Sequence, residues 1–188
     1  MRSLILCEGE TDAILLSYYL QRTCGWSFMK KSPPGVNIKA DRVHGESANW
    51  YRRGGDDLLI CAVGSKDRFQ CFFDEKIAPP LKSSSGAVFS KIALMVDHND
   101  ETEAEIVQRV QKELPLVAQN AEQNAWVTHE YENGYHETRR LVSKAYLGVT
   151  WAVQSPQKVF QFIDAQLRDT PWEQSEILRE TFEKLLEI

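Results

Sequence analysis

Three runs of apolar residues divide the chain, and each has the length of one buried strand. They cover residues 3–7, 58–63 and 92–96. None of them alternates between apolar and polar positions, which is typical of strands covered by helices on both faces. The pattern therefore predicts an α/β fold with a mainly parallel sheet.

Each of the first two runs is followed by a segment that favours a helix. Residues 12–22 have apolar positions one turn apart, with Thr11 as the expected N-cap. A short helix is expected over residues 67–77, ended by Pro79 and Pro80. Strand and helix thus alternate, as in parallel sheets built from right-handed crossovers.

The third run leads into a helix with sharper boundaries. Asp100 as N-cap and Glu103 at the third helical position form a capping-box pattern. Pro115 is expected to end this helix. The apolar positions between them fall on one helix face, namely Ala104, Val107, Val110 and Leu114.

The remaining segments complete the expected fold. Residues 25–56 hold Pro and Gly at irregular positions, which predicts a long connection with little regular structure. Short strands are expected at 126–128 and 149–153, and two helices begun by Ser-Pro and Thr-Pro pairs follow them. The sequence thus predicts a sheet of about four strands flanked by helices, with further helices at the C-terminal end.

Composition limits the function classes. The chain has 188 residues and a formal net charge of −5. This charge argues against a general nucleic-acid coat protein, because phosphate binding draws on lysine and arginine. A local basic groove, or a metal ion that bridges carboxylates to phosphate, is compatible with it.

Cysteine usage and the N-terminal segment bear on the compartment. The cysteines at 7, 24, 61 and 71 form no CxxC pair, and a disulfide framework is not expected in a chain of this kind. The sequence shows neither a signal-peptide pattern nor an apolar segment long enough to cross a membrane. We therefore expect a reduced, cytoplasmic protein that does not bind membranes.

Carboxylates follow the first and third apolar runs. Glu8 ends the first run, and Asp97 ends the third, with Asn99 and Asp100 close behind. Residues at the carboxyl ends of strands in an open α/β sheet border the crevice where ligands bind. Their oxygens are the ligands that Mg²⁺ prefers. We therefore expect Glu8 and Asp97 to lie side by side and to hold a divalent cation.

Several neighbouring residues have two interpretations. Asp12 either joins the metal site or favours the first turn of its helix through the helix dipole. Asp100 is either a ligand or an N-cap. His98 either joins the site or is a polar turn residue. His129 and His136 lie in an acidic stretch, which favours a solvated face over a zinc site.

These acids, in this order, resemble the motifs of the TOPRIM domain, the catalytic fold of topoisomerases, bacterial primases and OLD-family nucleases. In that family a glutamate followed by glycine ends the first strand, and an Asp-x-Asp motif ends the third. Segment 8–12 reads Glu-Gly-Glu-Thr-Asp, and its acid at Asp12 is typical of the OLD type. Asp97 matches the first aspartate of the second motif, whereas Asn99 replaces the second. The chain is also similar to small stand-alone TOPRIM-like proteins of bacteria.

The resemblance implies a domain division and residue roles. Residues 1–130 would form a TOPRIM-like, Rossmann-type domain, and residues 131–188 a mostly helical extension packed on it. Glu8 would be the general acid/base, and Asp97 would hold Mg²⁺ or Mn²⁺. The further candidate metal ligands are Asp12, Asn99 and Asp100. The implied activity is Mg²⁺-dependent hydrolysis or transfer of nucleic-acid phosphodiesters.

Basic residues supply candidates for phosphate binding. Lys66 follows the second run, at the same expected sheet edge, and either contacts phosphate during catalysis or is an exposed lysine that begins a helix. Basic residues interleaved with aromatics are used to bind single strands. Such a cluster lies in the long connection, with Trp50, Arg52 and Arg53 as nucleic-acid-binding candidates beside His44 and Tyr51. In the alternative interpretation, Trp50 anchors a loop whose arginines lie in solvent.

Three functions follow from these observations. The preferred one is a metal-dependent enzyme acting on DNA or RNA through Glu8 and Asp97. The second is a TOPRIM-like module that binds metal, nucleic acid or a partner protein with little or no catalysis, which Asn99 and the net negative charge favour. The third is an unrelated phosphotransfer or receiver-like protein, which the single acid at Glu8 fits poorly.

Overall fold

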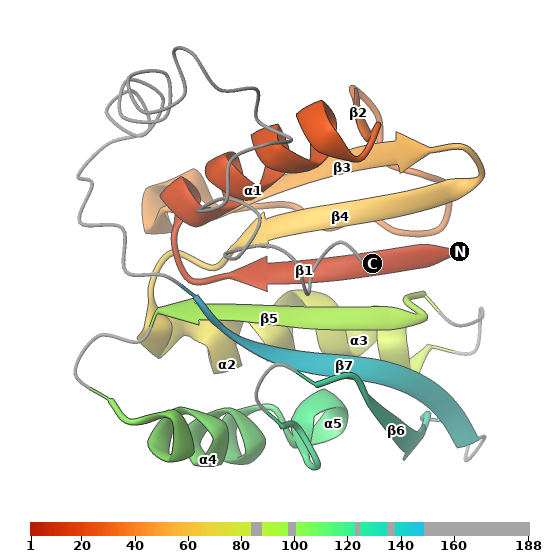
Figure 1. Cartoon of the computed structure of the whole chain (residues 1–188). Coiled ribbons are helices and arrows are strands. Elements are labelled where there is room, and N and C mark those ends of the chain that lie inside the picture. The colour runs from red at the N-terminus through yellow and green to blue at the C-terminus, as the bar shows by residue number, and fades with distance from the viewer. Residues whose placement is uncertain (84–87, 98–100, 123–124, 135–137, 149–188) are drawn as a thin grey trace.

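The fold is built on one seven-stranded sheet with the strand order β2-β3-β4-β1-β5-β7-β6 (Figure 1). The structure is a computed structural model that describes residues 1–83, 88–97, 101–122, 125–134 and 138–148. The strands are β1 (Arg2–Cys7), β2 (Ser27–Met29), β3 (Ser47–Arg53), β4 (Asp56–Ala62), β5 (Lys91–Asp97), β6 (Val127–Glu132) and β7 (Thr138–Gly148).

The centre of the sheet is parallel and both of its sides are antiparallel. Strand β1 pairs in parallel with β4 and β5, and β5 pairs in parallel with β7. The pairs β2–β3, β3–β4 and β6–β7 are antiparallel. The α/β class is confirmed and four strands form a parallel centre, but the expectation of a mainly parallel sheet of about four strands was wrong, because the whole sheet is mixed and larger.

Helices cover both faces of the sheet. The helices and helical turns are α1 (Glu10–Thr23), η1 (Arg42–His44), η2 (Lys66–Arg68), α2 (Phe69–Phe72), η3 (Phe73–Ile77), α3 (Ala78–Lys82), α4 (Glu103–Glu113) and α5 (Pro115–Ala118). Figure 1 shows α1 on one face and α2 and α3 on the other. No helix within the described residues combines the length and apolar composition needed to span a membrane.

The side chains of β1 point alternately to the two faces of the sheet, so the core has one layer on each face. Ile5 and Cys7 pack with α1, whereas Leu4 and Leu6 pack with the residues of α2–α5 on the opposite face. All four side chains are fully buried. This explains the continuous apolar run in β1, since side chains that alternate between two covered faces must all be apolar.

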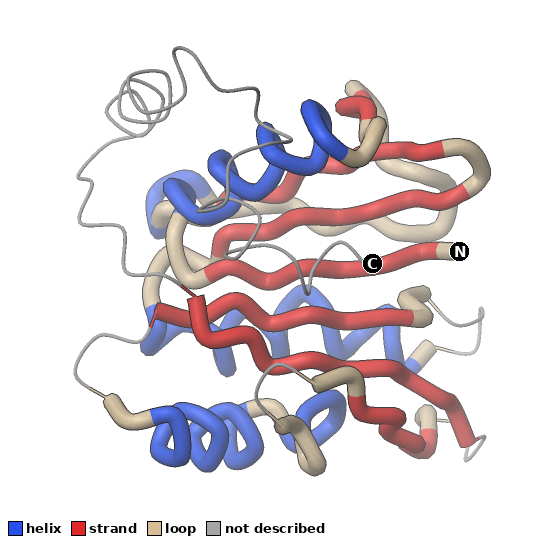
Figure 2. The backbone as a smooth tube through the Cα atoms, viewed as in Figure 1, coloured by secondary structure: helices blue, strands red, loops and turns tan. Residues whose placement is uncertain are grey.

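The expected irregular connection at residues 25–56 was wrong. It contains β2, η1 and β3, and β3 forms an antiparallel hairpin with β4 through Gly54 and Gly55 (Figure 2). A two-residue turn of two glycines is a recognised hairpin signal, because glycine adopts positive φ at low cost. Gly54 has a φ of 58°.

Three helix boundaries differ from expectation. Helix α1 is capped by Gly9 rather than by Thr11. Helix α4 has Thr102 as its N-cap, and its capping box uses Glu105, so the expected Asp100–Glu103 box was wrong. The helical segment that begins after β4 continues through both prolines to the end of α3, because these prolines occupy the first turn of α3, where no N–H donor is needed.

The end of the described chain extends the sheet. The strand expected at 126–128 is confirmed as β6, and β7 follows it. The expected domain boundary at residue 130 therefore falls inside a strand of the same sheet. The strand expected at 149–153 and the closing helices lie outside the described residues.

Candidate functional site

The carboxyl ends of β4, β1 and β5 meet at one edge of the sheet, and Glu8 lies between them. Its N–H donates to the carbonyl of Met95 at 3.1 Å, and its carbonyl accepts from the N–H of Gly64 at 3.1 Å. The backbone of Glu8 is thus fixed by both neighbouring strands.

Asp97 lies beside Glu8 along this edge. Cys7 pairs with Met95 in the register of β1 and β5, so Asp97 lies one residue beyond the level of Glu8 on the adjacent strand. Neighbouring strands are about 4.8 Å apart. The fold therefore brings the backbones of the two predicted site residues together. The other predicted residues of the second motif, His98, Asn99 and Asp100, lie outside the described residues.

Lys66 begins η2, directly after β4, and lies at the same edge as expected. Its Nζ is 3.7 Å from Glu101 Oε2. Arg109 of α4 donates two hydrogen bonds to the same carboxylate, from Nε at 2.9 Å and from an Nη at 3.0 Å. These hydrogen bonds from Arg109 hold the pKa of Glu101 below its ordinary value. Glu101 is therefore a paired anion rather than a free metal ligand.

Arg109 also acts on Glu8. Burial opposes its charge, but hydrogen bonding to Glu101 and the charges of Glu101, Glu113 and Glu8 outweigh burial and raise the pKa of Arg109. A permanent cation thus lies within electrostatic range of Glu8. The sequence analysis missed Arg109, and its position among the polar residues of α4 gives no local signal for this role.

Asp12 has a defined structural role. It is buried, and its Oδ2 accepts a hydrogen bond from the N–H of Gly9 at 3.0 Å. This contact satisfies a backbone donor at the start of α1. The capping interaction favours the structural interpretation of Asp12 over a primary role in metal binding.

We expect the Asp12→Ala substitution to lower the free energy of unfolding by about 1 kcal/mol, the usual cost of losing a helix cap. Asp12→Asn should retain most of this stability, because the amide oxygen still accepts from Gly9. Urea denaturation of both variants tests this expectation. Equal losses in the two variants would contradict it, since they would point to the charge rather than to the hydrogen bond.

The residues at the carboxyl ends of β1 and β5 include two acids. Glu8 and Asp97 supply carboxylates, which are typical Mg²⁺ ligands. Within the described residues, no group of three Asp, Glu, His or Cys side chains could hold a metal ion.

The basic cluster predicted for nucleic-acid binding lies elsewhere. Trp50 is buried and stacks with Phe89 at 6.3 Å between ring centroids. Arg52 Nε bonds Asp57 Oδ1 at 2.7 Å. Asp57 pairs with Arg2 at the opposite end of β1 from Glu8, about 20 Å away by strand geometry. The expectation that these residues lie in a loop was wrong, because they belong to strand β3.

Arg53 likewise has an internal contact. Its guanidinium lies 4.5 Å from the ring centroid of Trp26, a cation–π arrangement. It precedes the hairpin turn, at the same end of the sheet as Arg52. The structure therefore does not bring Arg52 and Arg53 together with Glu8, although it does bring Lys66 there.

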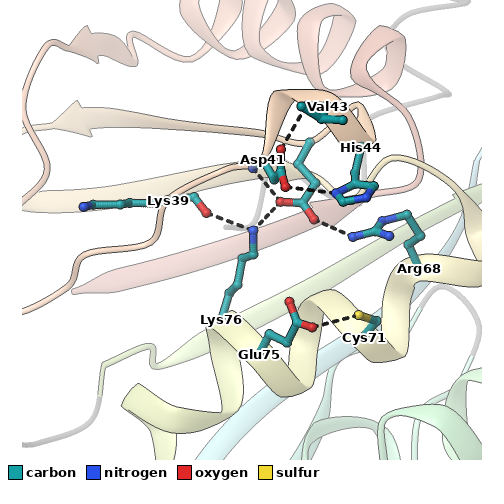
Figure 3. Close-up of polar contacts among 9 residues, drawn as sticks. Lys39, Asp41, Val43, His44, Arg68, Cys71, Glu75 and Lys76 are labelled. Carbon is teal, nitrogen blue, oxygen red and sulfur yellow. Dashed lines mark hydrogen bonds and ion pairs between the residues drawn. The ribbon is translucent and has the colours of Figure 1, made fainter.

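A second polar cluster, missed by the sequence analysis, surrounds Glu46 (Figure 3). Its side chain has no exposed surface, and it accepts from Arg68 at 2.9 Å, from the N–H of Asp41 at 2.7 Å and from Lys76. Burial alone would raise the pKa of Glu46, but its bonds to Lys76, Asp41 and Arg68 outweigh burial and lower it. The carboxylate is therefore held in its charged form.

Glu46 fixes a tight turn over residues 41–46. Within the turn, Asp41 accepts from the N–H of Val43 at 2.9 Å and pairs with His44 at 3.0 Å. The turn packs directly on Gly64, where an added Cβ would overlap the carbonyl oxygen of His44. Since Gly64 also bonds Glu8, the turn and the sheet edge form one connected structure.

Beside this turn lies a hollow of about 730 Å³. Glu10, at the start of α1, forms one wall, and the segment between Lys39 and Asn49 forms the rest. Because Glu10 is two residues from Glu8, the hollow adjoins the candidate site.

Comparison with known proteins supports the fold class. No protein-family model matches the sequence, and no curated protein matches it. Among solved structures, the chain is similar to the crystal structure of a hypothetical protein from Pyrococcus horikoshii OT3, with a TM-score of 0.50 and 16% sequence identity. The match covers 96% of this chain and 74% of the other.

Proposed function

We propose that this chain is a TOPRIM-like protein that hydrolyses or transfers phosphodiesters of nucleic acid with the help of Mg²⁺ or Mn²⁺. The observation that supports the proposal is the position of Glu8 and Asp97 at the carboxyl ends of neighbouring parallel strands, with Lys66 at the same edge. Acids in this position border the ligand crevice of an open α/β sheet.

Each residue has a definite task in this proposal. Glu8 transfers the proton of the attacking or leaving oxygen as general acid/base. Asp97 would hold the metal ion, which would supply neutralisation of charge on the phosphoryl group. Lys66 contacts a phosphate oxygen as a point charge. Arg109 adds a positive charge within electrostatic range of Glu8.

A second candidate function is a binding module with little or no catalysis. The observation that favours it is the pairing of the neighbouring acids, since Asp12 caps α1 and Glu101 is held by Arg109. Asn99, which lacks a charge where the resemblance expects an aspartate, points the same way. In this case the metal ion or the nucleic acid binds without turnover.

Cleavage assays separate the two functions. Single-stranded, duplex and supercoiled DNA are incubated with the protein and Mg²⁺ or Mn²⁺. We expect Glu8→Gln to lower the cleavage rate at least about a hundredfold, the typical contribution of a general acid/base. Asp97→Asn should lower it similarly by weakening metal binding. The exposed acids Glu103 and Asp74 supply matched controls as Glu103→Gln and Asp74→Asn.

The outcomes are distinct. Absence of cleavage by the wild-type protein with both metals would reject the enzyme. Calorimetric binding of Mn²⁺ that Asp97→Asn abolishes would then support the binding module. Cleavage that Glu8→Gln leaves unchanged would show that the activity belongs to another site or to a contaminant.

A further inference from the structure

The hollow beside Glu8 presents two cationic side chains. Arg42 and Lys39 are both exposed and line it. The Arg42 side chain makes no hydrogen bond or ion pair with the part of the chain that the structure describes. Figure 3 shows the Lys39 side chain pointing away from Lys76, whose ammonium group donates to the backbone carbonyl of Lys39. Both cations are therefore available to an anionic ligand.

The other polar groups that line the hollow do not neutralise the positive charges of Arg42 and Lys39. Glu46 also lines the hollow, but its charge is already matched by Arg68 and Lys76. Ser47 and Asn49 also line the hollow and add neutral hydrogen-bond donors. Glu10 is the remaining acid of the lining, and it forms no ion pair with Arg42 or Lys39 within the described residues.

The wall that holds Arg42 is rigid before any ligand binds. Gly45 ends η1 with a φ of 72°, and Asp41 caps the turn through Val43. Val43 is 90% exposed, so burial of its side chain does not hold the turn in place, and the polar contacts of Asp41 and Glu46 do. A preformed wall reduces the entropy that a ligand must lose on binding.

The distance to Glu8 fits a neighbouring nucleotide. Two residues of extended chain span at most about 7 Å, so Glu10 is within that distance of Glu8. Successive phosphates of one DNA strand advance by about 3.4 Å along the duplex axis. The Glu10 end of the hollow is thus within about two phosphate spacings of a phosphodiester at Glu8.

We propose that this hollow binds a backbone phosphate of a polynucleotide, next to the phosphodiester that reacts at Glu8, with Arg42 as its main ligand and Lys39 in support. The inference rests on the proposed function, because that function names the polynucleotide. An arginine suits this task, since its planar fork can make two hydrogen bonds to one phosphate.

Binding of a fluorescein-labelled, 20-nucleotide single-stranded DNA tests the proposal. Anisotropy is measured at salt concentrations from 50 to 200 mM with EDTA present, so that no cleavage occurs. We expect Arg42→Gln to weaken binding about tenfold, as loss of a charge-assisted hydrogen bond does. The slope of log affinity against log salt should become shallower by about 0.7, the value for one phosphate contact on a single strand.

Arg22 provides the matched control. It is an exposed arginine in the last turn of α1, about 18 Å along the helix from Glu10. Arg22→Gln removes the same charge and should change affinity less than twofold. Equal losses in the two variants would overturn the proposal, because they would indicate general electrostatic attraction.

Two further outcomes separate this proposal from the proposed function. If Arg42→Gln leaves binding unchanged, or if the wild-type protein does not bind the DNA, the phosphate site is rejected, whatever the cleavage assay shows. If Arg42→Gln weakens binding selectively and the wild-type protein does not cleave, the phosphate site stands and the binding module replaces the enzyme.

Discussion

Replacement of Gly64 by alanine is expected to lower the free energy of unfolding by about 4 kcal/mol. Two costs combine at this position. Gly64 has a φ of 99°, where an L-residue is strained by roughly 1–2 kcal/mol. The added Cβ would also overlap the carbonyl oxygen of His44, and such crowding costs roughly 1–3 kcal/mol. Since the obstacle is backbone, no side-chain rotation relieves it.

Gly54→Ala is the matched control for this prediction. Gly54 also has a positive φ, at 58°, but an added Cβ meets nothing within 4 Å. Its replacement should cost only the backbone strain, about 1–2 kcal/mol. Urea denaturation measures both variants. Equal losses would contradict the close packing of the 41–46 turn on Gly64.

The Gly64 variant should also disturb the candidate site. The N–H of Gly64 donates to the carbonyl of Glu8, so a shift of this loop moves the backbone of Glu8. If the Gly64→Ala variant still folds, we expect it to cleave DNA more slowly or to bind metal more weakly than the wild-type protein. The Gly54 variant, at the opposite end of β4, should leave both unchanged.

The second large effect is expected for Glu46→Ala, with a loss of about 3 kcal/mol. The substitution leaves Lys76 and Arg68, which are only 17% and 27% exposed, without their shared anion. It also removes the acceptor for the N–H of Asp41. Glu75→Ala is the control, because Glu75 is exposed and surface substitutions usually change stability by less than about 0.5 kcal/mol.

The pH dependence gives a separate test of Glu46. Its pKa is lower in the folded protein than its ordinary value of 4.5. The charged form is therefore favoured by folding, and its contribution is present above the ordinary pKa and is lost as pH falls through the folded pKa. The stability difference between the wild type and Glu46→Ala should narrow below about pH 4.5. A difference that stays constant down to pH 2 would contradict the ionic role.

The strands at the centre of the fold could be predicted because they are covered on both faces. In β1, β4 and β5 nearly every position is buried, so each gives an uninterrupted apolar run. Strand β3 has only Trp50 and Tyr51 buried among its seven residues, so its apolar signal is weak. Its best signal was the Gly-Gly turn that follows it.

The position of a site residue could be predicted when that residue lies at the end of an apolar strand that the sequence itself reveals. Glu8 and Asp97 satisfy that condition. Arg109 and Glu46 do not, because their roles depend on partners from other elements. Glu46 is 22 and 30 residues from Arg68 and Lys76, and its neighbours in the sequence, Gly45 and Ser47, suggest a solvated turn. Their importance becomes visible only when the elements are assembled.

The central position of β1 has a consequence for biosynthesis. This strand leaves the ribosome before β4 and β5, and its contacts with them join residues 55 and 88 positions apart. Until β5 has been made, an apolar strand with open edges is exposed to other chains, a known aggregation hazard. Nascent chains that stop before residue 91 should therefore depend on chaperones, and the neighbourhood of Glu8 and Asp97 is completed only after β5 has emerged.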